Sequence, residues 1–331
     1  MKKNHLKLFY FNQKQLFSFL LKELQKYYNN IEYMQDNYIY VVGNIPILLV
    51  SHLDTVFTKK ISNIQFNKKD RYYFSDNGLG ADDRAGVTMI LNCLENGFLP
   101  SILFCCDEEI GAIGANSFIK TNDKTVLKDI NIIIELDRQG YNEYTTYTCD
   151  NPALNKYAES FELKKVSGTF SDIYDLCPFY EIGGINMSVG YCSQHTKKEK
   201  LYIDDYNDML LVVFNILSCP PSEKIEYIKE EYTYVNSYCL TDYWKNKSNF
   251  NKYSTATTSE YSINFDMCEI LDSDYLETDN SYSELFNFIE NNYDEVMTHA
   301  KKSAIMAIIK LKREHDQAKY NIQEFDQHSL K

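Results

Sequence analysis

Four apolar runs, rich in β-branched residues and leucine, alternate along the chain with segments of helical periodicity. The apolar runs cover residues 45–50, 99–106, 130–136 and 182–189. The helical segments cover residues 82–96, 110–120, 151–165 and 204–217. Short continuous apolar runs are typical of strands buried on both faces, and strands that alternate with helices favour parallel pairing. The pattern therefore predicts an α/β fold with a mostly parallel mixed sheet flanked by helices.

The remaining N-terminal segments add one helix and further strands to this prediction. Residues 6–28 carry apolar groups at helical spacing, at least from Gln13 onward. Residues 31–42 are expected to form one strand, and a turn at Gly43-Asn44 leads to the run at 45–50 as a paired or adjacent strand. Residues 61–66 and 72–74 flank a polar tetrapeptide and predict a surface hairpin.

The character of the chain changes after Cys219-Pro220-Pro221. Residues 230–280 are rich in Tyr, Ser, Thr and Asn without a sustained period, and an apolar helical stripe returns near 294–315. We expect a catalytic domain over residues 1–222 and a partly helical C-terminal extension over 223–331. The apolar stripe is more often a face packed on the parent domain than a partner site, and oligomerisation is the alternative.

Charge and composition narrow the range of functions and locations expected for the protein. The chain has 331 residues and a formal net charge of −13, which argues against binding to nucleic acid or to an anionic membrane surface. No apolar run approaches the roughly 18 residues that span a bilayer, and the N-terminus lacks a convincing signal peptide. The 9 cysteines include no Cys-x-x-Cys pair, which favours a reducing cytoplasm.

Polar side chains of the metal-ligating type follow the ends of the predicted strands. They are His52 and Asp54, Glu108 and Glu109, Asp137, and His195, with Asp82 and Asp83 at the start of a helix. Singly, these residues also suit helix capping or a solvated loop. Together, carboxylates converging on one sheet edge would repel one another unless cations neutralise them. The mixture of imidazole and carboxylate predicts two divalent ions, with zinc favoured and manganese or cobalt also suitable.

The order of these motifs resembles the dinuclear-zinc exopeptidase superfamily, which includes bacterial aminopeptidases, tripeptidases and acetylornithine-deacetylase-like hydrolases. The resemblance covers about residues 45–218. It rests on the segments His52-Leu53-Asp54, Gly80 to Gly86, Asp107 to Gly111, Glu135-Leu136-Asp137 and His195 to Glu199, and on Ser171-Asp172 and Gly183 to Gly190.

The resemblance implies a ligand set. Asp82 would bridge the two ions, His52 and Asp137 would complete the shell of one, and Glu109 and His195 that of the other. It also implies a cis peptide bond after Asp82.

The resemblance further implies catalytic roles for two other residues. Glu108 would act as general base on a metal-activated water that attacks an amide carbonyl, and Asp54 would orient His52. Asp172 would contact a substrate amine or lie behind the ligands, with helix capping about as plausible.

The spacing of the motifs bears on the substrate. The segments between the ligands are too short for the lid or dimerisation insertion common in such enzymes, so a compact catalytic domain is expected. In the superfamily that the motifs resemble, Asp rather than Glu at the position of Asp137 accompanies removal of N-terminal residues, so the resemblance favours an aminopeptidase acting on a small peptide. An N-acyl amino-acid deacylase with the same site is the alternative. A hypothesis of a different functional class is an interaction protein that keeps this fold but has lost catalytic activity. A homo-oligomeric state is compatible with either enzyme.

Overall fold

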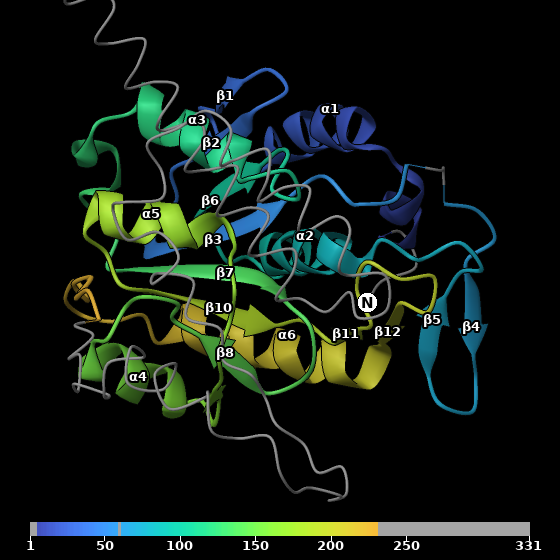
Figure 1. Ribbon diagram of the computed structural model, residues 1–331. Helices are drawn as coiled ribbons and strands as arrows, with labels where there is room; N and C mark the ends of the chain where they lie inside the picture. Colours follow the sequence, from blue (N-terminus) through green and yellow to red (C-terminus); the bar gives the residue numbers. More distant parts are fainter. Residues whose placement is uncertain (1–4, 59–60, 231–331) are drawn as a thin grey trace, which may run out of the picture. The chain divides into compact units, whose positions relative to one another are not determined.

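The computed structural model describes residues 5–58 and 61–230. An eight-stranded sheet runs through this part of the chain in the order β1-β2-β6-β3-β7-β10-β8-β9 (Figure 1). Its central strands β6, β3, β7 and β10 are parallel, whereas β1, β2 and β8 each pair antiparallel with a neighbour. The strands are β1 (Glu32–Met34), β2 (Tyr38–Val41), β3 (Ile45–His52), β6 (Pro100–Cys105), β7 (Ile132–Arg138), β8 (Glu143–Thr145), β9 (Lys164–Lys165) and β10 (Gly184–Ser188). The predicted α/β class with a mostly parallel sheet is confirmed.

Helices cover both faces of this sheet because both faces of its strands are apolar (Figure 1). One core joins strand residues such as Leu49 and Ile134 to the helices α1 (Gln13–Leu24), α2 (Ala81–Glu95), α4 (Pro152–Glu159) and α6 (Ile203–Ser218). The alternate strand residues, such as Val50 and Ile133, face α3 (Ile113–Thr121) and α5 (Asp172–Tyr180). The described residues also form two short 3-10 helices, η1 (Leu6–Tyr10) and η2 (Lys124–Leu127).

A second, four-stranded sheet has the order β11-β12-β5-β4. Its strands are β4 (Gln65–Asn67), β5 (Tyr72–Phe74), β11 (Tyr191–Cys192) and β12 (Lys200–Tyr202). The hairpin expected near residues 61–74 is therefore present as β4 and β5, and β12 pairs along its free edge. This pairing places the loop between β11 and β12, which carries His195, beside the segment that leads into α2.

Three expectations for the local structure are wrong. Residues 31–42 form two antiparallel strands rather than one, because the chain reverses at Asp36, which has a φ of 59°. Strand β2 does not neighbour β3, since β6 lies between them. The helix expected over 151–165 is also shorter and ends at Glu159, before Glu162 adopts a φ of 64°.

The described chain continues past residue 222 without leaving the body of the fold. The amide of Gly183 donates to the carbonyl of Ile225 at 2.7 Å, and the amide of Ile225 donates to the carbonyl of Asn131 at 2.8 Å. The first compact unit ends at Glu230. The helix predicted near 294–315 and nearly all of the predicted extension lie outside the described residues. Among the residues that are described, no helix has the length and apolarity needed to cross a bilayer.

Candidate metal centre

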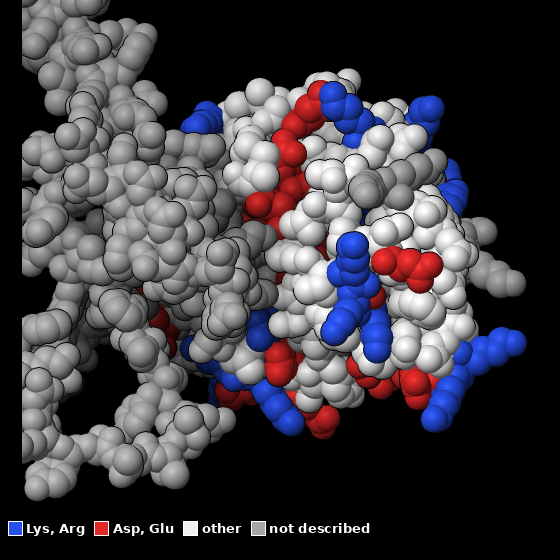
Figure 2. Space-filling view, turned by 45° about the vertical axis from the view of Figure 1, so that its right-hand side comes forward, with Lys and Arg blue, Asp and Glu red and all other residues white. Residues whose placement is uncertain are grey.

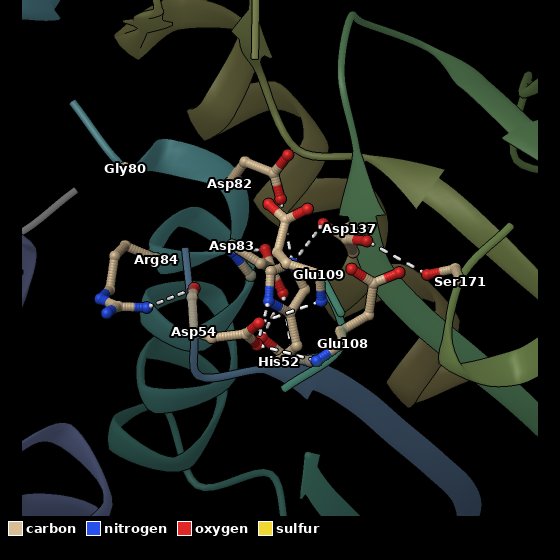
Figure 3. A network of polar contacts seen from close by, with 12 residues as sticks. His52, Asp54, Gly80, Asp82, Asp83, Arg84, Glu108, Glu109, Asp137 and Ser171 are labelled. Atoms are coloured by element: carbon tan, nitrogen blue, oxygen red, sulfur yellow. Dashed lines mark hydrogen bonds and ion pairs between the residues drawn. The ribbon is translucent and has the colours of Figure 1, made fainter. Parts of the chain in front are cut away.

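Four polar segments meet at the carboxyl ends of the parallel strands (Figure 3). His52 is the last residue of β3, Asp137 lies near the end of β7, and Glu108 and Glu109 follow β6. Since β6, β3 and β7 are neighbours in the sheet, their ends lie side by side. Helix α2 packs against β3 and β7 and brings Asp82 to the same edge. The strand ends that the sequence singled out thus converge, as expected for an open α/β sheet.

Asp82 lies between the two histidines. Its Oδ1 atom is 2.9 Å from Nε2 of His52, and its Oδ2 atom is 2.9 Å from Nε2 of His195. Nε2 of His52 also lies 3.3 Å from Oδ1 of Asp137, and Nε2 of His195 lies 2.9 Å from Oε1 of Glu109. The five side chains therefore form two groups that share Asp82, the grouping that the resemblance implies.

The geometry of these groups fits divalent cations. Two atoms that each lie about 2.0 Å from a tetrahedral zinc ion are about 3.3 Å apart, close to the separations between these donor atoms. Ligand atoms of His52, Asp82 and Glu109 lie within 4.8 Å of one another, as do those of His52, Asp83 and Asp137. Burial raises the pKa of Asp137 to about 6, and nearby carboxylates add to the effect. Cations at this edge would remove that electrostatic cost.

Asp54 connects His52 to the loop after β6. Its Oδ1 atom lies 3.1 Å from Nδ1 of His52, on the opposite side of the ring from Asp82. The same carboxylate accepts hydrogen bonds at 3.0 Å from the backbone amides of Glu108 and Glu109. These contacts hold the pKa of Asp54 below its usual range despite burial. Asp54 is therefore placed to fix both the His52 ring and the loop that carries Glu108.

Glu108 lies at the edge of the cluster, and Figure 3 shows its side chain directed into it. Burial raises the pKa of its carboxyl group well above the usual range, opposed by His52 and reinforced by Asp137 and other acids. A carboxyl group with a raised pKa binds a proton more readily near neutral pH, which suits proton transfer.

The peptide bond between Asp82 and Asp83 is cis, as the resemblance implies. The Asp83 side chain accepts hydrogen bonds from the hydroxyl of Ser51, from the amide of Gly86 at 2.8 Å and from the amide of His52 at 3.3 Å. Gly86 allows α2 to approach β7, because a Cβ atom there would lie 2.0 Å from the carbonyl oxygen of Leu136. Asp83 thus joins the start of α2 to the end of β3.

Several buried residues that contact the predicted ligands were not assigned a role from the sequence. Oδ2 of Asp137 accepts a hydrogen bond from the hydroxyl of Ser171 at 3.1 Å, and its Oδ1 accepts one from the hydroxyl of Tyr191 at 3.2 Å. Glu199 has no exposed surface and accepts hydrogen bonds from the amides of Leu79, Gly80 and Asp82. Glu199 belongs to the motif around His195, so its position in the sequence was visible, but its contact with the Asp82 segment arises only from the fold.

Glu135 on β7 and Asp172 at the start of α5 are two further acidic residues with no exposed surface. Glu135 accepts hydrogen bonds from the amides of Asp172 and Ile173 at the start of α5, at 3.2 and 3.4 Å. Asp172 has no exposed surface, and burial raises its pKa to about 7. A fully buried side chain does not fit the direct contact with a substrate amine considered for Asp172.

Arg84 supplies a buried positive charge beside this acidic cluster. Its Nη1 atom donates to the carbonyl of Asp54 at 3.1 Å, and its Nη2 atom donates to the carbonyl of Phe11 at 3.2 Å. The side chain is only 1% exposed, and burial lowers its pKa to about 10.

On the surface shown in Figure 2, acidic side chains form a band between neutral regions, and basic side chains form separate small groups.

Residues 37–174 match the model of peptidase family M28. The matched segment is similar to this peptidase family over less than half of the chain, and it carries most of the motifs that resemble the dinuclear-zinc exopeptidase superfamily. The match includes four of the five predicted ligands, and His195 lies beyond it. The family match supports the prediction of a metallo-exopeptidase.

Solved structures with similar folds include a tripeptidase from Staphylococcus aureus, at 15% identity and a TM-score of 0.51, covering 64% of this chain and 95% of that one. The aminopeptidase PepT from Bacillus cereus, at 15% identity, has a TM-score of 0.49 and covers 65% of this chain and 96% of that one. A TET1 peptidase from Pyrococcus horikoshii, at 12% identity, has a TM-score of 0.45, and the match covers 63% of this chain and 97% of that one. No curated protein gives a significant match. At such identities the likeness establishes the fold alone.

Proposed function

We propose that the protein is an aminopeptidase that uses two divalent ions, most suitably zinc, to hydrolyse a small peptide. The arrangement of Asp82 carries the proposal, because its two carboxylate oxygens each face a different histidine at 2.9 Å. A carboxylate placed in this way can bridge two ions. His52 and Asp137 would hold one ion, and Glu109 and His195 the other.

The ions would supply an electrophile for the scissile carbonyl and an activated water. The chain's own residues would handle the proton. Glu108 would take the proton of the attacking water and return it to the leaving amine, consistent with the raised pKa of its carboxyl group. Asp54 would keep the ring of His52 in place and, through the amides of Glu108 and Glu109, fix the loop that carries the base.

Hydrolysis of an N-acyl amino acid is the second candidate, because the same base and ligands would serve either amide. Asp137 favours the aminopeptidase, on the resemblance of this position to enzymes that remove N-terminal residues. A small substrate also suits a catalytic domain whose segments between ligands are short. A homo-oligomeric state remains a prediction.

A substrate panel with metal analysis tests the proposal. The full-length protein, reconstituted with zinc, manganese or cobalt, would be assayed on aminoacyl amides, dipeptides, tripeptides and N-acyl amino acids. We expect two bound ions per chain and cleavage of substrates with a free amino terminus. Cleavage of only the N-acyl substrates would favour the deacylase. Fewer than one bound ion, with no hydrolysis of any substrate, would favour an interaction protein on this fold.

A further inference from the structure

Gln13, the first residue of α1, is paired through its side chain with Asp107. Its Nε2 atom donates a hydrogen bond to Oδ1 of Asp107 at 2.9 Å, and its Oε1 atom accepts one from the backbone amide of Asp107 at 3.1 Å. One planar amide group therefore satisfies a donor and an acceptor of the same residue. Such a double contact fixes orientation as well as distance.

This contact completes a row of three consecutive backbone amides held by side-chain oxygens. The amide of Asp107 donates to Gln13, and the amides of Glu108 and Glu109 donate to the two carboxylate oxygens of Asp54. Asp107 itself has a φ of 58°, in the left-handed region that is uncommon for residues other than glycine. Specific contacts are needed to keep the backbone of this loop in that conformation.

The segment that carries Gln13 is firmly attached to the rest of the fold. Asn12 and Gln15 form a reciprocal capping box at the start of α1, and Leu16 and Leu20 have no exposed surface. The carbonyl of Phe11, two residues before Gln13, accepts a hydrogen bond from Arg84. A side chain on such a support can hold its partner precisely.

We infer that Gln13 is a positioning residue that holds the loop carrying Glu108 and Glu109. The inference rests on the proposed function for its catalytic consequence, but the contact itself belongs to the fold. Gln13 lies outside residues 37–174, which match the peptidase family model. The N-terminal helix is therefore part of the machinery that orients the base, although it contributes no ligand.

Exchanging the two partners tests the inference. Gln13→Ala removes both hydrogen bonds. Gln13→Glu keeps the length of the side chain but places a carboxylate against the carboxylate of Asp107. In the double variant Gln13→Glu, Asp107→Asn, the new amide group at position 107 can donate to the new carboxylate at position 13. The backbone amide of residue 107 can donate to the same carboxylate, so both contacts again pair a donor with an acceptor. Ser18→Ala is the control, because it truncates an exposed side chain on the same helix and leaves both the capping box and Asp107 untouched.

Two readouts are compared in the full-length, metal-reconstituted protein: the kinetics, and hydrogen exchange of a peptide covering residues 106–112. Gln13→Ala and Gln13→Glu should lower kcat about tenfold with KM and metal content unchanged, and should speed exchange of this peptide. The double variant should recover both, and Ser18→Ala should change neither. Unchanged exchange in Gln13→Ala, or failure of the double variant to recover, would overturn the inference. If the unsubstituted protein hydrolyses no substrate, the proposed function fails, and the exchange comparison still decides whether Gln13 holds the loop.

Discussion

Oδ1 of Asp54 lies 3.1 Å from Nδ1 of His52, and the same carboxylate accepts hydrogen bonds from the backbone amides of Glu108 and Glu109. One side chain thus links a predicted ligand to the predicted base. An ionised carboxylate can accept all three hydrogen bonds, because each of its oxygens has two lone pairs. A side chain with only one acceptor oxygen cannot.

The first prediction follows from this shared acceptor. Asp54→Asn places an amide NH2 group against one of the backbone amides or against His52, so at least one contact is lost. We expect kcat or metal affinity to fall about 10–100-fold, as is usual when the partner of a ligating histidine is changed. Steady-state kinetics and metal titration measure this. Asp208→Asn, at an exposed position on α6, is the control and should behave like the unsubstituted protein.

The second prediction concerns the base. Glu108→Gln keeps the size of the side chain but cannot take up a proton at neutral pH. Turnover should fall about 10²–10⁴-fold while metal content stays the same, because Glu108 is not among the predicted ligands. Single-turnover assays with parallel elemental analysis check both quantities, and Glu162→Gln at the exposed end beyond α4 serves as control. Full activity in Glu108→Gln would show that another residue is the base.

The third prediction concerns the stability that Arg84 provides. Arg84→Met removes a buried charge and leaves the carbonyls of Asp54 and Phe11 without their donor. The free energy of unfolding should fall by about 2–4 kcal/mol. Arg84→Lys should recover only part of the loss, because lysine has a single terminal nitrogen and lacks the guanidinium group whose two nitrogens reach both carbonyls. Urea denaturation measures the effect. Arg71→Met, which removes an exposed pair with Asp204, should change stability little.

The fourth prediction concerns alkaline pH. Burial, together with the charges of Glu32 and Asp129, raises the pKa of Tyr40 to about 12, above the ordinary value of 10.0. Between these values the unfolded chain releases the proton and the folded protein keeps it, so stability decreases as pH rises through about 10–12. Tyr40→Phe should lessen this decrease by about 1 kcal/mol at pH 11. Urea denaturation at pH 9 and pH 11 checks the slope, with the exposed Tyr33→Phe as control. Equal slopes in all three proteins would contradict the assignment.

Much of the sheet could be predicted because each of its central strands is a continuous apolar run that ends in polar residues. His52, the Glu108 segment and Asp137 mark the ends of β3, β6 and β7, and their convergence follows from parallel pairing. The reversal at Asp36 was missed although the polar stretch Gln35-Asp36-Asn37, which separates the two apolar halves of residues 31–42, is of the kind that favours a turn. The order of β2, β6 and β3 depends on pairing between distant segments, which local periodicity does not encode.

The supporting contacts of the centre were less accessible to sequence reasoning. Gln13 and Arg84 stand in helical segments where a polar side chain is ordinarily read as a solvent-facing one. Their partners, Asp107 and the carbonyls of Asp54 and Phe11, lie far away in the sequence or belong to the backbone. Only packing of α1 and α2 against the sheet brings these groups together.

The central claim is that Asp82 bridges two ions, and anomalous scattering from crystals of the zinc-reconstituted protein tests it most directly. We predict two anomalous peaks at the zinc edge, one beside His52 and Asp137 and the other beside Glu109 and His195, with a carboxylate oxygen of Asp82 on each. A single peak, or two peaks that do not share Asp82, would contradict the account.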